Sequence, residues 1–262
     1  LEKIRSQIAG EDIVPERERE ERSKDKNDRF LYPPILGSTM PTVNFEYTFE
    51  NFIVGSTNQF AHAASFAVAD NPALIYNPLV IFGPSGVGKT HLLLAIKNHI
   101  KKKFPGRKIE YTRGEDFTNQ LIQSLHEGKL GMGTVDDFRS KFRNADILLV
   151  DDIHFIAGKE QTQEEFYNTF DALLQKGKQI VVTLDRPPKE IKTLNDRIRS
   201  RFEGGLFADI TPPDFETRVG IINKKAEQMG FEIDENISFY IAEHITVNTR
   251  QLEGVVKKLQ AF

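Results

Sequence analysis

The octapeptide GPSGVGKT, residues 83–90, decides the fold of this chain. It fits the pattern G-x-x-x-x-G-K-[ST] at every position. The apolar run LVIF (79–82) precedes it, and the amphipathic pattern THLLLAIKNHIKK (90–102) follows it. A strand, this loop and a helix in that order form a phosphate-binding loop, so the octapeptide predicts a nucleotide-binding α/β domain.

The residue types of the loop suit a polyphosphate bound with Mg²⁺. Glycines let the backbone fold around an anion, and the free N–H groups at the start of the next helix face the phosphates. Lys89 is expected to reach the β- and γ-phosphates, and the Thr90 hydroxyl to bind Mg²⁺. The other predicted nucleotide contacts of this stretch are Gly83, Pro84, Ser85, Gly86, Val87, Gly88 and His91.

Short apolar runs, rich in branched residues, recur along the chain and alternate with helical patterns. This alternation predicts a five-stranded parallel sheet with helices on both faces. The four further predicted strands are IEYT (109–112), ILLVD (147–151), IVVTL (180–184) and LFADI (206–210). After TPPD (211–214) only helical patterns follow. We therefore expect a nucleotide-binding domain at 42–211 and a small all-helical lid domain at 212–262.

Residues 1–41 differ in composition from the rest of the chain. The stretch PEREREERSKDKNDR (15–29) alternates charges of both signs and holds almost no apolar residue. Such a segment buries too little surface to offset its ordering entropy, so we expect a charged, flexible linker. Because the chain opens on Leu1 rather than Met, we also expect it to be a fragment of a longer protein.

The overall composition narrows the function classes. With 262 residues, 39% of them hydrophobic, the chain can bury one sizeable core. It has no run of 18 apolar residues and no apolar N-terminal block, so we expect a cytoplasmic protein without a transmembrane segment. The absence of cysteine and the spacing of the six histidines argue against a tightly held transition metal. With a net charge of −3, any contact with nucleic acid must be local.

Two acidic residues follow the run ILLV. Asp151 and Asp152 stand at the end of a predicted strand, which we expect to neighbour the loop strand. Asp151 is the candidate that holds Mg²⁺ through water, and Asp152 the one that orients or deprotonates the attacking water. Capping of the next turn is the alternative for both. Thr183 or Asp185, at the end of IVVTLD, is expected to sense the γ-phosphate.

The stretch NDRIRSRFEGG (195–205) places three arginines in five positions. In a helix, Arg197 and Arg201 lie one turn apart on one face, while Arg199 projects elsewhere. By itself the pattern favours a solvated basic helix end.

Six stretches occur in this order: GPSGVGKTHLL, ILLVDDIHFIAGKEQTQEEF, TLDRPPKEI, DRIRSRFEGGL, PPDFETRVGII and NTRQLEGVV. Together they resemble the DnaA family of bacterial chromosomal replication initiators, which are AAA+ ATPases. The resemblance runs from about Tyr47 to the end of the chain. It implies that ATP-bound protomers assemble into a filament on origin DNA and promote strand opening, with slow ATP hydrolysis as the off-switch.

The resemblance also implies cofactors and partners. These are ATP or ADP with Mg²⁺, further copies of the chain, and origin DNA, as a single strand for this fragment. For the full protein it adds the replicative helicase, regulators and acidic phospholipid. The family's C-terminal helix-turn-helix domain, which reads duplex origin boxes, is expected to be absent because the chain ends at Phe262.

Segment 51–65 resembles the family's adenine-binding motif, and the resemblance places Phe52, Ile53, Val54 and Asn58 at the base.

Three arginines take family roles by the same resemblance. In the family, the stretch that matches residues 195–205 is a motif that faces the neighbouring protomer. Arg201 falls at its arginine-finger position and Arg197 at its second arginine, so both are expected to face the ATP of a neighbouring protomer. Arg250 matches the sensor arginine of the lid and is expected to touch the phosphates of its own subunit.

By resemblance, Ile122, Lys159 and Thr162 are expected to line the axial channel of the filament and to contact one DNA strand. The alternative for Thr162 is a cap at the start of the helix QEEFYNTF. Gln161 occupies a position that is often basic in relatives, which weakens one of the expected DNA contacts.

Three other classes stay open: a helicase loader, a regulatory paralogue of the initiator, and a metabolic P-loop kinase. Residues 113–145 resemble the initiator's helical insertion, which favours the initiator, although loaders carry an insertion of similar kind. The arginines of residues 195–205, expected to act on a neighbouring protomer, argue against the kinase. No stretch of the sequence indicates a binding site for a small-molecule phosphoryl acceptor.

Overall fold

The computed structural model describes residues 47–129, 135–246 and 248–260. The predicted linker at 1–41 lies outside the described residues. The described part belongs to one compact unit of the chain, which spans residues 45–262.

A five-stranded parallel sheet forms the centre of the fold, as predicted. Each strand lies within one residue of its predicted bounds. In sequence order the strands are β1 (Leu79–Phe82), β2 (Ile109–Arg113), β3 (Ile147–Asp151), β4 (Gln179–Leu184) and β5 (Leu206–Asp209).

The strands lie in the order β2-β3-β4-β1-β5. Strand β4 therefore separates the loop strand β1 from β3, which carries the acidic pair. The expectation that β3 neighbours β1 is wrong, because crossover connections let consecutive strands skip positions in a parallel sheet.

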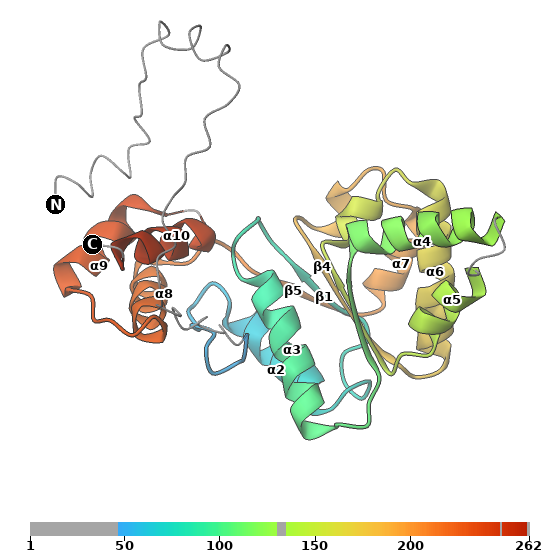
Figure 1. The fold of residues 1–262 in the computed structure, drawn as a ribbon, viewed down its shortest axis with the longest axis horizontal. Helices are drawn as coiled ribbons and strands as arrows, with labels where there is room; N and C mark the ends of the chain where they lie inside the picture. Colours follow the sequence, from blue (N-terminus) through green and yellow to red (C-terminus); the bar gives the residue numbers. More distant parts are fainter. Residues whose placement is uncertain (1–46, 130–134, 247, 261–262) are drawn as a thin grey trace, which may run out of the picture. The chain divides into compact units, whose positions relative to one another are not determined.

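Helices cover both faces of the sheet (Figure 1). One face carries α2 (Gln59–Asp70) and α3 (Lys89–Lys103). The other carries α4 (Gly114–Lys129), α5 (Val135–Arg143), α6 (Glu160–Gln175) and α7 (Asp196–Glu203). Two short 3₁₀ helices, η3 (Ile153–Ile156) and η4 (Pro188–Glu190), follow β3 and β4. The α/β class predicted from the alternating pattern is confirmed.

Phenylalanine rings fill the core under α4, α5 and α6. Phe117 lies 5.0 Å from Phe138 and from Phe142 between ring centres, and 5.8 Å from Phe166. Phe117, Phe142 and Phe166 are fully buried. This cluster fixes α4 and α5 against α6, and α4 also packs against η3.

Three helices follow the sheet and have an apolar cluster of their own. They are α8 (Phe215–Gln228), α9 (Glu235–His244) and α10 (Thr249–Leu259). Each starts at an N-cap whose side chain accepts a backbone N–H: Asp214, Asp234 and Asn248. Such caps satisfy orphan donors at the helix start, which is why these sequence positions begin helices. The boundary at residue 212 stays a prediction.

None of the helices in the described ranges is both long and apolar enough to cross a membrane.

Asp214 ties the segment that precedes α2 to α8. Its Oδ1 accepts the N–H of Thr217 at 2.9 Å, and its Oδ2 accepts the hydroxyl of Ser56 at 2.7 Å. Hydrogen bonds to Thr217 and then to Ser56 lower the pKa of Asp214 to about 2 from its ordinary 3.8. A carboxylate whose pKa is lowered by folding stabilises the fold at pH values above its pKa in the unfolded state. This stabilisation is lost as the pH falls through the pKa of the folded state.

We predict that Asp214→Ala lowers the free energy of unfolding at neutral pH by about 1 kcal/mol, the usual cost of a lost N-cap. The difference from the unmodified protein should shrink as the pH falls from about 4 to about 2, because the carboxylate becomes protonated. Urea denaturation at a series of pH values measures both. Asp214→Asn keeps an oxygen acceptor and should cost less, and an equal cost for the two variants would contradict the capping role.

Candidate nucleotide-binding site

The loop between β1 and α3 has a backbone that only glycine adopts readily. Gly86 has φ of 79° and Gly88 of 108°. A Cβ at Gly86 would lie 2.0 Å from the Asn248 side chain, and one at Gly88 would lie 2.9 Å from the ring of Phe52. The glycines therefore serve both the turn and the close packing around it.

Lys89 points back into this loop. Its ammonium donates to the carbonyl oxygens of Gly83 at 2.7 Å and Pro84 at 2.8 Å. The residue is 6% exposed, and burial lowers its pKa, partly opposed by Asp152 and Asp151. The carbonyls hold the ammonium group at the mouth of the loop, the place where the motif puts the β- and γ-phosphates.

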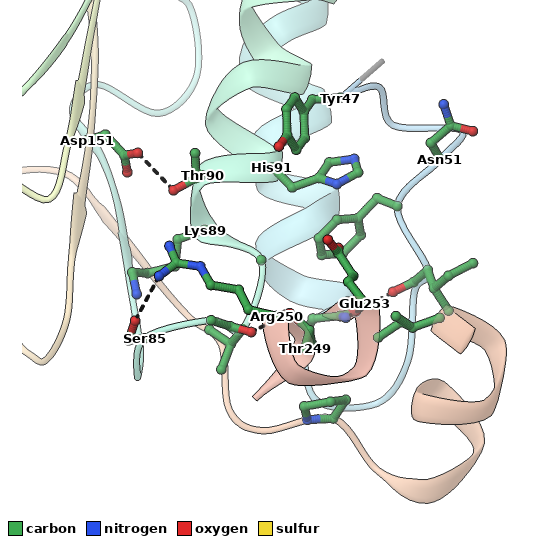
Figure 2. A pocket seen from close by; sticks show the side chains of 18 of the residues that line it. Tyr47, Asn51, Ser85, Lys89, Thr90, His91, Asp151, Thr249, Arg250 and Glu253 are labelled. Atoms are coloured by element: carbon green, nitrogen blue, oxygen red, sulfur yellow. Dashed lines mark hydrogen bonds between the residues drawn. The ribbon is translucent and has the colours of Figure 1, made fainter. Parts of the chain in front are cut away.

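Asp151 is the centre of a buried hydrogen-bond cluster. Its Oδ2 accepts the Thr90 hydroxyl at 2.8 Å, a contact visible in Figure 2, and the Tyr111 hydroxyl at 3.3 Å. Its Oδ1 accepts the Thr183 hydroxyl at 2.6 Å. The carboxylate is 2% exposed, so these donors replace the water that it loses. The two predicted Mg²⁺ ligands, Thr90 of α3 and Asp151 of β3, thus lie together although β4 separates β3 from the loop strand β1.

Asp152 takes an unusual backbone conformation. Its φ of 50° and ψ of 51° lie in the left-handed region, which is uncommon for residues other than glycine. Its N–H donates to the Thr183 hydroxyl at 2.8 Å, which holds this turn in place. Burial, followed by the charge of Asp151, raises the pKa of Asp152. A carboxylate with a raised pKa is a stronger proton acceptor, which suits the predicted role of Asp152 as a base.

A cavity of about 630 Å³ opens beside the loop. The loop and the start of α3 line it, together with segment 47–58 and the helices α8 and α10. Its volume falls within the range of small-molecule sites, which is about 300–1,000 Å³.

Segment 47–58 supplies the apolar wall. Phe52, Ile53 and Asn58, three of the predicted base contacts, line the cavity. The Asn58 side chain accepts the N–H of Gly55 at 2.9 Å and donates to the carbonyl of Ile53 at 3.1 Å, so it shapes the turn. Val54 does not line the cavity and is 47% exposed. The structure thus does not support a base contact for Val54, whose side chain is open to solvent and lies outside the lining.

His91 connects α3 to the same wall. Its Nε2 lies 2.8 Å from the carbonyl oxygen of Thr48, and the imidazole ring contacts Tyr47 and Phe52, each with 5.2 Å between ring centres. Burial lowers the pKa of His91, which favours the neutral ring. His91, a predicted nucleotide contact, also lines the cavity.

The start of α10 contacts the phosphate-binding loop through Thr249. The Thr249 N–H donates to the carbonyl of Gly86 at 3.0 Å, and the Thr249 hydroxyl donates to the same oxygen. Arg250 lines the cavity, and its Nη1 lies 3.4 Å from the Ser85 hydroxyl (Figure 2). Sequence reasoning identified Arg250 but missed Thr249. Its position next to the predicted sensor arginine was the only local signal.

Other lining residues were also missed. They come from five separate elements and have no common motif, so no spacing in the sequence joins them. They include Arg113, Glu115, Phe155, Lys224, Lys225 and Glu253.

Asp185, Arg197 and Arg201 do not line the cavity. The Asp185 carboxylate pairs with Arg186 at 2.8 Å, and its other oxygen lies 3.7 Å from Nδ1 of His154. Arg197 is exposed and forms no ion pair with any other described residue. Arg201 pairs with Asp171 of α6 at 2.5 Å.

The three predicted DNA contacts have different environments. Ile122 on α4 is 48% exposed, and Lys159 is exposed at the N-cap of α6. Thr162 is only 4% exposed, within the first turn of a helix that begins at Glu160. The prediction that Thr162 caps this helix is wrong, because α6 begins two residues earlier. Its buried side chain is also closed to a DNA strand in this conformation.

The donor set fits a nucleoside triphosphate with Mg²⁺. The loop offers backbone N–H groups at a helix start, Lys89 offers a positive charge, and Thr90 and Asp151 offer oxygen ligands. Mg²⁺ usually takes one or two protein ligands and completes its shell with water and phosphate oxygens.

Comparison with protein families agrees with this geometry. The family model described as the bacterial DnaA ATPase domain matches residues 43–209, which is more than half of the chain. The chain belongs to the bacterial DnaA ATPase family.

Solved DnaA structures resemble this chain closely. Domain III of the Thermotoga maritima replication initiation protein DnaA is 42% identical, with a TM-score of 0.79 over 83% of this chain and 89% of that one. A replication initiator DnaA bound to AMPPCP and single-stranded DNA is 36% identical, with a TM-score of 0.75 over 84% of this chain and 66% of that one. The present chain therefore spans about two thirds of that longer DnaA chain.

The DnaC helicase loader is more distant. It is 16% identical, with a TM-score of 0.52 over 64% of this chain and 98% of that one. That likeness shows the AAA+ fold alone, whereas the DnaA matches show the family.

We predict that Thr183→Val lowers the rate of ATP hydrolysis about tenfold or more, because such supporting hydrogen bonds typically contribute a factor of 10–100. Nucleotide affinity should change far less, since Thr183 does not line the cavity. Single-turnover hydrolysis and nucleotide titration measure the two effects. Thr112→Val, a buried threonine of β2 outside the Asp151 cluster, is the control. Equal turnover in both variants would sink the prediction.

Proposed function

We propose that this chain is the ATP-dependent switch of a replication initiator. It binds ATP with Mg²⁺, assembles with copies of itself on origin DNA, promotes strand opening, and is turned off by slow hydrolysis. One observation carries the proposal: the loop, the acid cluster and Arg250 surround one cavity, while Arg197 and Arg201 lie outside it. The membership in the DnaA family supports the same reading.

Five residues of the cavity have the following roles in this proposal. Lys89 and the loop N–H groups bind the β- and γ-phosphates, and Thr90 and Asp151 hold Mg²⁺, which neutralises charge on the phosphate oxygens. Asp152 accepts the proton of the attacking water. Arg250 contacts the phosphates from α10, which couples the C-terminal helices to the nucleotide.

Arg201 acts on the ATP of a neighbouring protomer. A guanidinium supplied in trans neutralises γ-phosphate charge, so the subunit contact forms best when the triphosphate is present. Arg197, one turn away and exposed, joins the same contact. Asp185 senses the γ-phosphate in this proposal, although its carboxylate now faces Arg186.

Single-stranded DNA is the proposed ligand of the surface that holds Ile122 and Lys159. Both side chains are exposed, and α4 packs against η3, which precedes Lys159. The DnaA bound to AMPPCP and single-stranded DNA gives this proposal a precedent. Thr162 takes part only if α6 moves, because its side chain is buried.

The remaining parts of the proposal concern organisation and partners. We place the nucleotide-binding domain at 42–211 and the lid at 212–262, supported by the separate apolar cluster of α8, α9 and α10. We place the protein in the cytoplasm. Replicative helicase, regulators and acidic phospholipid are proposed partners of the full protein only.

We predict that Arg201→Ala removes ATP-dependent assembly and leaves the ATP affinity of the isolated subunit nearly unchanged, because Arg201 does not line its own cavity. Sedimentation with ATP against ADP, together with nucleotide titration, measures both. Arg199→Ala is the control, because Arg199 lies on the same helix and pairs with Asp196. Loss of ATP binding by the monomeric Arg201 variant would show that the side chain acts in cis. Phosphoryl transfer to a small molecule without assembly would favour the kinase.

We predict that Lys159→Ala weakens binding of an oligo-dT strand in ATP and makes its salt dependence shallower, because one phosphate contact is lost. Thermal stability should barely change, since Lys159 is exposed. Lys176→Ala, at the other end of α6, is the matched control. If strand binding and its salt slope are unaltered while ATP binding is intact, this surface is not the DNA contact. That result would favour a helicase loader or a regulatory paralogue of the initiator.

A further inference from the structure

Two side chains of α6 hold Arg201. The Nη2 atom of Arg201 lies 2.5 Å from Oδ1 of Asp171, and its guanidinium carbon lies 5.8 Å from the centre of the Tyr167 ring. Tyr167 and Asp171 are four residues apart on one helix, so they lie on the same face, one turn apart. The guanidinium therefore packs along a short stripe of α6.

The base of this stripe is rigid. Phe170 precedes Asp171 and Phe202 follows Arg201, and the two rings pack with 5.7 Å between their centres. Phe170 is 1% exposed and Phe202 is fully buried. Because these neighbours are fixed in the core, the backbones that carry Arg201 and its two partners keep a defined spacing.

The held guanidinium stays open to solvent. The Arg201 side chain is 43% exposed although it is paired, while that of Asp171 is 23% exposed. A hydrogen bond to Tyr167 and the charge of Asp171 keep the pKa of Arg201 above its ordinary value. A guanidinium has five N–H donors, so two partners on one side leave others directed outward.

Arg197 differs from Arg201 in this respect. It lies one turn earlier on α7, is exposed, and has no ion pair within the described part of the chain. Of the two arginines on this face, only Arg201 has built support. The contacts of Arg201 with Asp171 and Tyr167 therefore need a functional explanation.

We propose that Asp171 and Tyr167 are positioning residues that hold Arg201 ready for the ATP of a neighbouring protomer. The proposal rests on the proposed function, in which Arg201 acts in trans. A free arginine side chain has many rotamers, and fixing it at the moment of contact weakens association. A side chain that its own subunit already holds avoids that loss, in the same way that supporting residues hold a catalytic group in place.

Two other readings of the contact make different predictions. An exposed ion pair often contributes almost nothing, in which case removing Asp171 changes no assembly property. If Asp171 instead competes with the incoming phosphate, removing it strengthens assembly. The sign of the change therefore separates the three cases.

The first test is Asp171→Asn, which keeps the size of the side chain and removes its charge. We expect the protein concentration for half-maximal ATP-dependent assembly to rise about tenfold, which corresponds to about 1.4 kcal/mol. The ATP affinity of the isolated subunit should not change. Asp70→Asn is the control, since Asp70 pairs with Lys103 on the opposite face of the sheet. Unchanged or strengthened assembly would overturn the proposal.

A second variant separates positioning from a structural role. In an Arg201→Lys background the planar fork is absent, so Asp171→Asn should change assembly less than about twofold. The same loss in both backgrounds would mean that Asp171 acts on the fold and not through Arg201.

A third measurement does not depend on assembly. In the isolated protomer, ¹⁵N relaxation of the Arg201 Nε–H should report an ordered side chain, and Asp171→Asn should lower its order parameter below about 0.6. Equal mobility in both proteins would overturn the positioning role itself. Asp171 could order Arg201 while the Arg201→Ala variant still assembles with ATP. That result would contradict the proposed trans function of Arg201, and the ordering by Asp171 would then have no role in assembly.

Discussion

The buried carboxylate of Asp151 is the constraint on which the site depends. A charged group that is 2% exposed is tolerated only when hydrogen bonds replace its water, and donors from three elements do so here. Thr90 comes from α3, Tyr111 from β2 and Thr183 from β4. The cluster therefore joins the loop helix to β2 and β4, the two strands that flank β3 in the sheet. It also sets the orientation of Asp152, whose N–H donates to the same Thr183 hydroxyl.

The loop is held from two directions. The Asp151 cluster fixes its helix end through Thr90, and α10 contacts its backbone through Thr249 and Gly86. Glycine at position 86 is needed for both the positive φ and the close approach of Asn248. A change in the tilt of α10 must therefore change contacts of the loop itself, which is the physical basis for coupling the C-terminal helices to a bound nucleotide.

Helix α6 connects the core to the surface that we propose for assembly. Its inner face buries Phe166 and Phe170 beneath the sheet, and its outer face presents Tyr167 and Asp171 to Arg201. The two functions belong to one helix because residues three and four apart share a face while their neighbours point elsewhere. The family resemblance placed both arginines at a neighbouring ATP, but the sequence did not reveal that Arg201 has supporting partners while Arg197 has no ion pair among the described residues.

The sequence by itself determined the features that arise from local patterns. GPSGVGKT predicted the phosphate loop, the apolar runs predicted all five strands to within one residue, and the caps before α8 and α10 follow from residue type. Such features depend on glycine conformation, on side-chain periodicity and on hydrogen bonds over a few residues. The tertiary structure alone decided the position of β4 between β1 and β3, the meeting of Tyr111 and Thr183 at Asp151, and the burial of Thr162. These depend on which elements become neighbours, and crossover connections bring together residues whose separation in the sequence carries no local signal.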